Sequence, residues 1–210
     1  MLQELFGFSN KENITLRNVL FALIFTAAAI AVNFCGSLIA EKITFPLYLD
    51  SLLTIGVVSL FGLIPGILCA FLSNLFLSIW TSSNLLFSIC HICTAFFAWC
   101  VFLIQEEIQK KSSGSISQKQ EFSIDAFIWA GLLAGLTNGF IGNAISAVVF
   151  KGQPPMPQAN IVVQGLYVAF ANLNLANNIA GLLENLIDKL LSAMLSFVFY
   201  LSLKNRKIEK

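Results

Sequence analysis

The sequence predicts an all-α membrane protein: a bundle of six transmembrane helices with both termini in the cytoplasm and structured outer loops. Two observations predict this class. Hydrophobic residues make up 57% of the 210 residues and charged residues only 11%, about half the charged fraction of an ordinary soluble domain. The apolar residues also form runs of about 20, the length that crosses the roughly 30 Å hydrocarbon core of a bilayer as a helix. We therefore treat residues 1–210 as one integral membrane domain.

Six apolar runs are predicted as helices, at about 19–40, 45–63, 65–80, 85–104, 126–150 and 177–203. The second and third are short arms on either side of Pro65 and Gly66, residue types that break helices. This hairpin either spans the membrane or enters it and returns. The later helices have the same orientation in both cases.

Lysine and arginine orient the predicted bundle, because these residues gather on the cytoplasmic side of membranes. Nine of the cations fall in segments predicted as cytoplasmic: Lys11, Arg17, Lys110, Lys111, Lys119, Lys204, Arg206, Lys207 and Lys210. Only Lys42 and Lys151 fall in outer segments, and Lys189 lies within the last helix. A net charge of +1 gives no reason to expect a nucleic-acid partner.

The connecting segments are of two kinds. The stretch 105–122 is rich in Ser, Gln and Lys and is predicted as a flexible cytoplasmic linker. The outer segments 41–50 and 151–176 contain too many apolar residues for plain loops, and we expect them to form structured lids. Within the second lid, 161–170 fits a short amphipathic helix at the membrane interface.

Charged residues within the last predicted helix are the strongest functional signal. Glu184 and Asp188 share one helical face with Asn177, and Lys189 follows directly. A charge facing lipid at that depth would cost at least about 2.5 kcal/mol, so this face must look into the bundle or into a water-filled cavity. Two interpretations remain open. The charges form a buried structural network, or they line a polar pocket for a ligand.

Under the pocket interpretation, other polar residues at a similar depth join the charged group. The candidate substrate-binding residues are Glu184, Asp188, Lys189, Asn143, Asn138, Asn177, His91 and Asn84. Two carboxylates face one lysine in this set, which favours a ligand with N–H donors or positive charge, such as a thiamin-like or nucleobase-like compound.

Small residues predict two packing surfaces. Gly131, Gly135 and Gly139 recur every four residues and form a stripe that another helix can approach closely. On the first helix, two pairs of small residues have the same spacing, Ala27 with Ala31 and Ala22 with Thr26. Either pair is a candidate docking surface for a partner protein, although packing within the bundle explains such pairs as well.

No cofactor or metal site is expected in this chain, and we do not expect an enzyme. The run Cys90–Cys93 holds two thiols and an imidazole, but no second ligand pair completes a tetrahedral metal site. The sequence has no phosphate-binding loop, no zinc-protease motif and no nucleophile elbow. Transport by this chain therefore requires an ion gradient or an energising partner.

Three stretches resemble the substrate-binding (S) components of the energy-coupling factor transporters of prokaryotes. "FPLYLDSLLTIGVVSLFGLIPGIL" (45–68) is similar to the first outer loop and second helix of that family. "GLTNGFIGNAISAVVFKG" (135–152) resembles its fifth helix and the following turn, and "LLENLIDKLLSAMLSFVFYL" (182–201) resembles its sixth. Relatives often have a glycine- and serine-rich turn after the fifth helix, where this chain has 153–157, "QPPMP".

The resemblance implies a multi-pass protein of the prokaryotic cell membrane that binds a vitamin or similar micronutrient at the outer ends of its helices. It also implies docking through small residues of the first helix, Ala27 and Ala31 or Ala22 and Thr26, onto a transmembrane coupling subunit that carries two ATPases. Two alternatives stay open. One is an ion-coupled secondary carrier, and the other is a transmembrane sensor or input domain.

Overall fold

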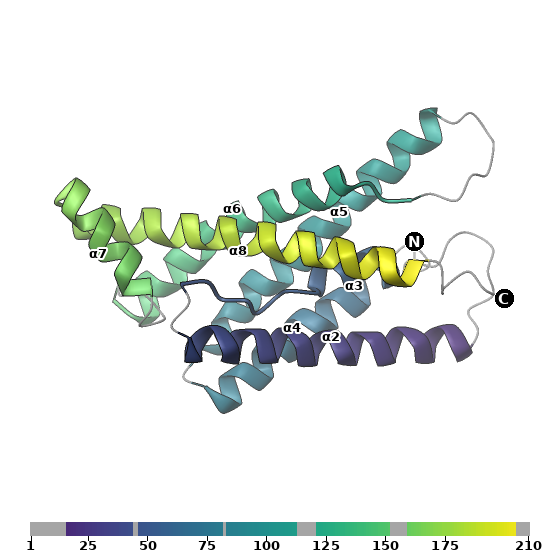
Figure 1. Cartoon of the computed structure of the whole chain (residues 1–210), viewed down its shortest axis with the longest axis horizontal. Helices are drawn as coiled ribbons and strands as arrows, with labels where there is room; N and C mark the ends of the chain where they lie inside the picture. The colour runs from purple at the N-terminus through teal and green to yellow at the C-terminus, as the bar shows by residue number, and fades with distance from the viewer. Residues whose placement is uncertain (1–15, 44–45, 82, 113–120, 152–158, 205–210) are drawn as a thin grey trace.

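The chain folds as a bundle of helices (Figure 1). The computed structural model describes residues 16–43, 46–81, 83–112, 121–151 and 159–204, and these residues contain no strand. Five helical segments are long and apolar enough to cross a membrane: α2 (Leu16–Lys42), α4 (Leu63–Trp80), the 3-10 turn η1 (Leu85–Phe87) with α5 (Ser88–Ser112), α6 (Ile124–Val149) and α8 (Leu173–Lys204). An all-α protein of membrane type is thus confirmed.

The predicted helix at 45–63 is confirmed only in its second half. α3 (Thr54–Phe61) is helical and Leu63 begins α4, but residues 46–53 are extended or turning. Figure 1 shows this extended stretch as a dark ribbon that runs from the end of α2 back along the bundle toward α3. The break between α3 and α4 lies at Gly62, whose φ of 87° suits glycine. Pro65 sits in the first turn of α4, where its missing N–H breaks no helical bond.

Side chains of α2 and α8 satisfy the backbone of the extended stretch. Leu49 N–H donates to Asp188 Oδ1 at 2.7 Å, Leu53 N–H donates to Asn33 Oδ1 at 3.0 Å, and Ser196 Oγ donates to Leu52 O at 2.9 Å. Inside a bilayer no water replaces a missing partner, so non-helical backbone is tolerated only where protein groups bond to it. The polar residues of α2 and α8 therefore supply bonding partners for the non-helical backbone of 46–53 inside the bundle.

The predicted glycine stripe is confirmed as a packing surface. A Cβ at Gly131, Gly135 or Gly139 would lie 2.8 Å from an atom of α8, closer than real Cβ contacts allow. Because these residues have no side chain, the backbones of α6 and α8 approach closely along their length. α8 begins at Leu173, four residues before the predicted start, and runs for 32 residues.

Two predicted connections differ from the structure. α5 continues to Ser112, so the first eight residues of the predicted linker 105–122 are helical, and 113–120 lie outside the described residues. In the predicted outer lid 151–176, α7 (Ala159–Phe170) confirms the short helix, and Val163 packs on Ala176 and Ala180 of α8. Residues 152–158 lie outside the described part, and 173–176 already belong to α8.

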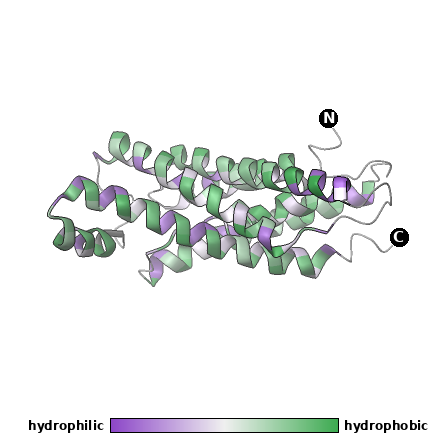
Figure 2. Ribbon diagram, turned by 90° about the horizontal axis from the view of Figure 1, so that it is seen from above, coloured by the Kyte–Doolittle hydropathy of each residue, from purple (hydrophilic) through white to green (hydrophobic). Residues whose placement is uncertain are grey.

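The described ends of the chain, Leu16 and Lys204, lie at the same end of the bundle (Figure 1). Aromatic side chains of the core pack at this end, among them Phe61, Phe102 and Phe127. Figure 2 shows apolar residues along the helices, and many large ones face outward, such as Phe140 at 68% exposure and Val148 at 83%. An apolar outer surface of this extent fits lipid contact.

Candidate ligand-binding site

A polar cavity of about 90 Å³ lies within the bundle, at the end away from Leu16 and Lys204. α2, the extended stretch, α4, α5, α6 and α8 all contribute to its wall. The lining runs from the exposed Glu41 to the buried Lys189, so the cavity extends from the bundle end to its interior. One water needs about 10–15 Å³ of such space, so the cavity has room for on the order of six to nine waters, or one small molecule.

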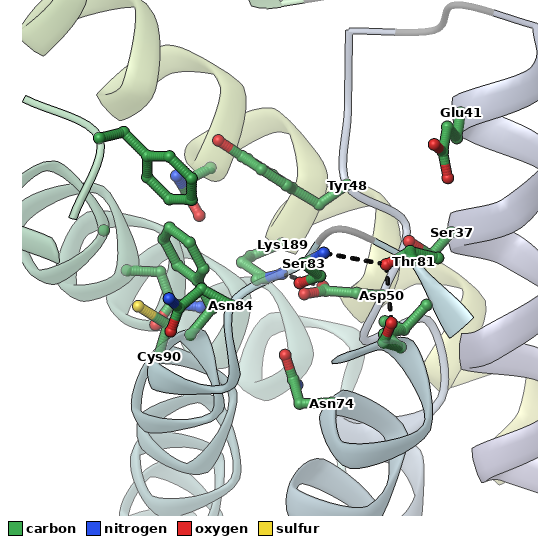
Figure 3. A pocket seen from close by; sticks show the side chains of 16 residues that line it. Ser37, Glu41, Tyr48, Asp50, Asn74, Thr81, Ser83, Asn84, Cys90 and Lys189 are labelled. Carbon is green, nitrogen blue, oxygen red and sulfur yellow. Dashed lines mark hydrogen bonds and ion pairs between the residues drawn. The ribbon is translucent and has the colours of Figure 1, made fainter. Parts of the chain in front are cut away.

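Lys189 is the centre of a buried ion cluster. Its Nζ lies 2.9 Å from Asp50 Oδ1 and 2.6 Å from Asp188 Oδ2. Asp188 is fully buried, whereas 19% of the Asp50 side chain is exposed, and Asp50 and Lys189 both line the cavity (Figure 3). Two carboxylates against one ammonium give the cluster a formal charge of −1.

The two interpretations of the charged residues in the last helix each describe part of this cluster. Asp188 belongs to a structural network, because its oxygens bond to Lys189 and to Leu49 N–H. Lys189 lies in the cavity wall, together with Asp50. Asp50 is not among the binding residues predicted from the sequence. A buried lysine requires carboxylate partners, and that requirement was the available signal for a second acidic residue.

A chain of buried polar groups supports the cavity wall from behind. Asn74 lines the cavity, and its Nδ2 donates to Ala70 O at 3.2 Å and to His91 Nδ1 at 2.6 Å. The His91 Nε2–H in turn faces Thr54 Oγ1 at 2.7 Å. Thr54 also accepts from Asn33 Nδ2 at 3.0 Å. His91 therefore acts behind the wall, since both ring nitrogens are engaged by protein groups.

One side of the cavity is aromatic. Phe87 and Phe150 stack with ring centroids 6.1 Å apart and planes inclined by 15°, and both line the cavity. Asn84 lies nearby on the wall, and its Oδ1 accepts from Leu86 N at 2.9 Å. This side offers a ring surface next to polar groups, an arrangement that suits a flat ligand.

The structure places three of the predicted binding residues in the cavity wall: Lys189, Asn138 and Asn84. The other five do not line it. Asp188 and His91 are buried behind the wall. Glu184 is 5% exposed, and its Oε1 has no hydrogen-bond partner among the described residues.

Asn143 and Asn177 lie toward the ends of α6 and α8 that are distant from Leu16 and Lys204. Asn143 Nδ2 donates to Asn178 O at 2.9 Å, and the buried Oδ1 of Asn177 is not part of the cavity wall. Binding roles for these two residues stay predictions. Sequence reasoning also did not select Tyr48 or Asn185, both of which line the cavity.

The two candidate docking pairs of α2 face different ways. Ala27 and Ala31 are exposed, whereas Ala22 is 8% and Thr26 6% exposed because both face the bundle. Only the first pair is accessible to another protein in this structure.

No group of three or more His, Cys, Asp or Glu side chains among the described residues is arranged to hold a metal ion. Comparison with known proteins yields no relative. No family model, no curated protein and no solved structure matches the chain.

Proposed function

We propose that this chain is the membrane-embedded substrate-binding subunit of an energy-coupling factor importer in a prokaryotic cell membrane. In this role it binds a vitamin or related small micronutrient, and partner ATPases supply the energy. The polar cavity inside an otherwise apolar bundle is the observation that carries the proposal. Polar groups at membrane depth are costly and mark binding sites or pathways.

The distribution of cations supports an outward-facing cavity. Arg17, Lys110, Lys111 and Lys204 belong to the helix ends opposite the cavity, and Lys42 and Lys151 to the cavity end. Under the positive-inside tendency, more cations stay on the cytoplasmic side. The cavity would then receive its ligand from outside the cell, as a binding subunit for uptake requires.

The exposed side of α2 supports docking onto a partner. Only 22% of its most apolar stretch is buried, compared with 33–39% in the other four long segments. Ala27 and Ala31 leave little side-chain bulk on that exposed side, so a helix of another subunit can approach closely. We propose this pair as the contact with the coupling subunit.

The test is co-purification from membranes of the native host, with an affinity tag on the chain. We expect a transmembrane coupling subunit and two ATPases to co-purify. Ala27→Leu combined with Ala31→Leu should abolish this co-purification. Val32→Leu, an exposed position about 140° from Ala27 and about 100° from Ala31 around the same helix, should not. Recovery of the chain without any ATPase from native membranes contradicts the proposal.

An ion-coupled carrier is a second candidate, favoured by one observation. The extended stretch 46–53 places non-helical backbone and the carboxylate of Asp50 inside the bundle, a feature that secondary transporters use to bind ions and substrates. Proteoliposomes that contain only this chain distinguish the two functions. Accumulation driven by a proton or sodium gradient without ATPases would favour the carrier.

A further inference from the structure

Asn138 presents an acceptor to the cavity, and its orientation is fixed by its neighbours. Thr94 Oγ1 donates its only hydrogen to Cys90 O at 3.3 Å. It must therefore accept from Asn138, whose amide nitrogen lies 2.9 Å away. The Nδ2 side of Asn138 is thus turned to Thr94, and Oδ1 is left buried with no partner among the described residues. A buried acceptor without a hydrogen-bond partner destabilises the protein, and a ligand that donates to it removes this cost.

The orientation of the Asn74 amide is also fixed by its hydrogen-bond partners. Ala70 O is a carbonyl and only accepts, so the Asn74 atom 3.2 Å from it must be the amide nitrogen. This nitrogen also serves His91 Nδ1. Oδ1 is the polar atom of Asn74 that remains for the cavity, and Figure 3 shows the side chain directed into the space beside Asp50.

Asn185 and Asp50 supply two further acceptor oxygens on residues that line the cavity. Asn185 Nδ2 donates to Gly181 O at 2.8 Å, which again leaves an oxygen on a residue that lines the cavity. Asp50 adds a carboxylate, of which only Oδ1 is bonded to Lys189. The one ammonium in the wall, that of Lys189, already faces two carboxylates. Asp50, Asn74, Asn138 and Asn185 therefore form a group of acceptors in the wall, and hydroxyl donors such as Ser37, Tyr48 and Ser83 also line the cavity.

We infer that the cavity takes a small, flat organic cation rich in N–H donors, such as an amidinium or an aminated heteroaromatic ring, which donates to Asp50, Asn74 and Asn138. This inference rests on the proposed function, because it names the class of molecule that the binding subunit carries. The N–H groups of such a cation fill the vacant acceptor sites, and its charge offsets the −1 of the ion cluster.

The aromatic side of the cavity favours a flat organic cation over a metal ion, and Asp50 disfavours an anion. Phe87 and Phe150 line the cavity, and aromatic rings attract a flat cation. A bare metal ion gains nothing from them and needs six or more oxygen ligands at about 2.0–2.6 Å. A carboxylate ligand would be repelled by Asp50 and would gain no hydrogen bond from the group of acceptors.

The experiment compares the binding of three flat aromatic probes of similar size to the full-length protein purified in detergent. Benzamidinium carries charge and N–H donors, N-methylpyridinium carries charge without N–H donors, and benzoate carries a negative charge. We expect benzamidinium to raise the thermal unfolding temperature and to give a saturable heat of binding. N-methylpyridinium should bind at least about tenfold more weakly, and benzoate, sodium and calcium ions should give no saturable signal.

Two asparagines supply matched variants. Asn138→Ala removes a cavity acceptor and should weaken benzamidinium binding about tenfold, the loss of one charge-assisted hydrogen bond. Asn178→Ala on α8 removes the same side chain from a position outside the cavity wall and should leave the affinity unchanged. If Asn138→Ala is not recovered in a folded form, Asn185→Ala replaces it, since its amide nitrogen bonds only within α8.

The outcomes separate this inference from the proposed function. Co-purification of ATPases together with preferred binding of benzoate, or with no benzamidinium binding, overturns the inference and leaves the proposed function standing. Benzamidinium binding that Asn138→Ala and Asn185→Ala do not weaken also overturns it. Selective benzamidinium binding without any ATPase partner supports the ligand class and contradicts the importer.

Discussion

The two halves of the bundle use the same helices for different purposes. Toward Leu16 and Lys204 the core is aromatic, and the ring of Phe127 lies 5.0–5.5 Å from those of Phe102, Phe197 and Tyr200. In the other half, the same α5, α6 and α8 present asparagines, a lysine and the cavity. Each helix thus changes from apolar packing to polar lining along its length.

The difference shows how a membrane protein can hold unpaired polar groups. The aromatic half buries large side chains tightly, and this packing stabilises the helix arrangement. The polar half can therefore keep a cavity and a buried acceptor such as Asn138 Oδ1 without losing the fold. Four predictions test this division of roles.

The largest effect is expected for Lys189→Met. It leaves Asp50 and Asp188 buried without a cation, and breaking such a cluster costs about 3–5 kcal/mol. Both the unfolding temperature in detergent and benzamidinium binding should fall. Lys204→Met is the control, because its pair with Glu121 lies near the surface and contributes at most about 1 kcal/mol. Equal effects of the two substitutions would contradict the buried cluster.

Phe127→Ala should destabilise the aromatic half and spare the cavity. The ring is fully buried, and its removal should lower the free energy of unfolding by about 3–5 kcal/mol. Measured below its unfolding temperature, the variant should bind benzamidinium with the affinity of the unaltered protein. A large loss of affinity would show that the two halves are not separable.

Two substitutions at Asp188 isolate its bond to the extended stretch. Asp188→Asn keeps an oxygen to accept from Leu49 N–H, whereas Asp188→Leu leaves that buried N–H without an acceptor. We expect the Leu variant to be less stable than the Asn variant by about 1–3 kcal/mol, as measured by thermal and denaturant unfolding. Variants of equal stability would mean that the bond does not hold the stretch.

The smallest effects are expected at glycines. Gly135→Ala should destabilise by roughly 1 kcal/mol or slightly more, because its Cβ would lie 2.8 Å from Leu186 Cα. Gly165→Ala on α7 meets no atom within 4 Å and should stabilise by about 0.5–1 kcal/mol through its higher helix propensity. Unfolding temperatures of the two variants should therefore move in opposite directions.

The long helices and the glycine stripe were predictable because length, apolar content and four-residue spacing are local properties. The extended stretch 46–53 was not predictable. Residues 46–53 are mostly apolar and read as part of a helix, but their backbone bonds to Asn33, Asp188 and Ser196. The local sequence does not indicate that the hydrogen-bond partners of this backbone lie on α2 and α8.

The candidate site was predictable in part for a related reason. Lys189 and Asn138 stood out as polar residues in apolar runs, and both line the cavity. Asp50 was read as the end of an outer loop, because its partner is 139 residues away. The orientation of Asn138 depends on how Thr94 uses its hydrogen, which requires coordinates.

The bonds from Leu49 and Asp50 to α8 also constrain the order in which the protein is made. Both join residues 139 positions apart, so the extended stretch leaves the ribosome long before its partners exist. The stretch therefore lacks its partners on α8 until α8 has been synthesised. The contacts of the extended stretch are thus completed only by α8, and a product that ends before α8 keeps the bond from Asn33 but lacks those from Asp188, Lys189 and Ser196.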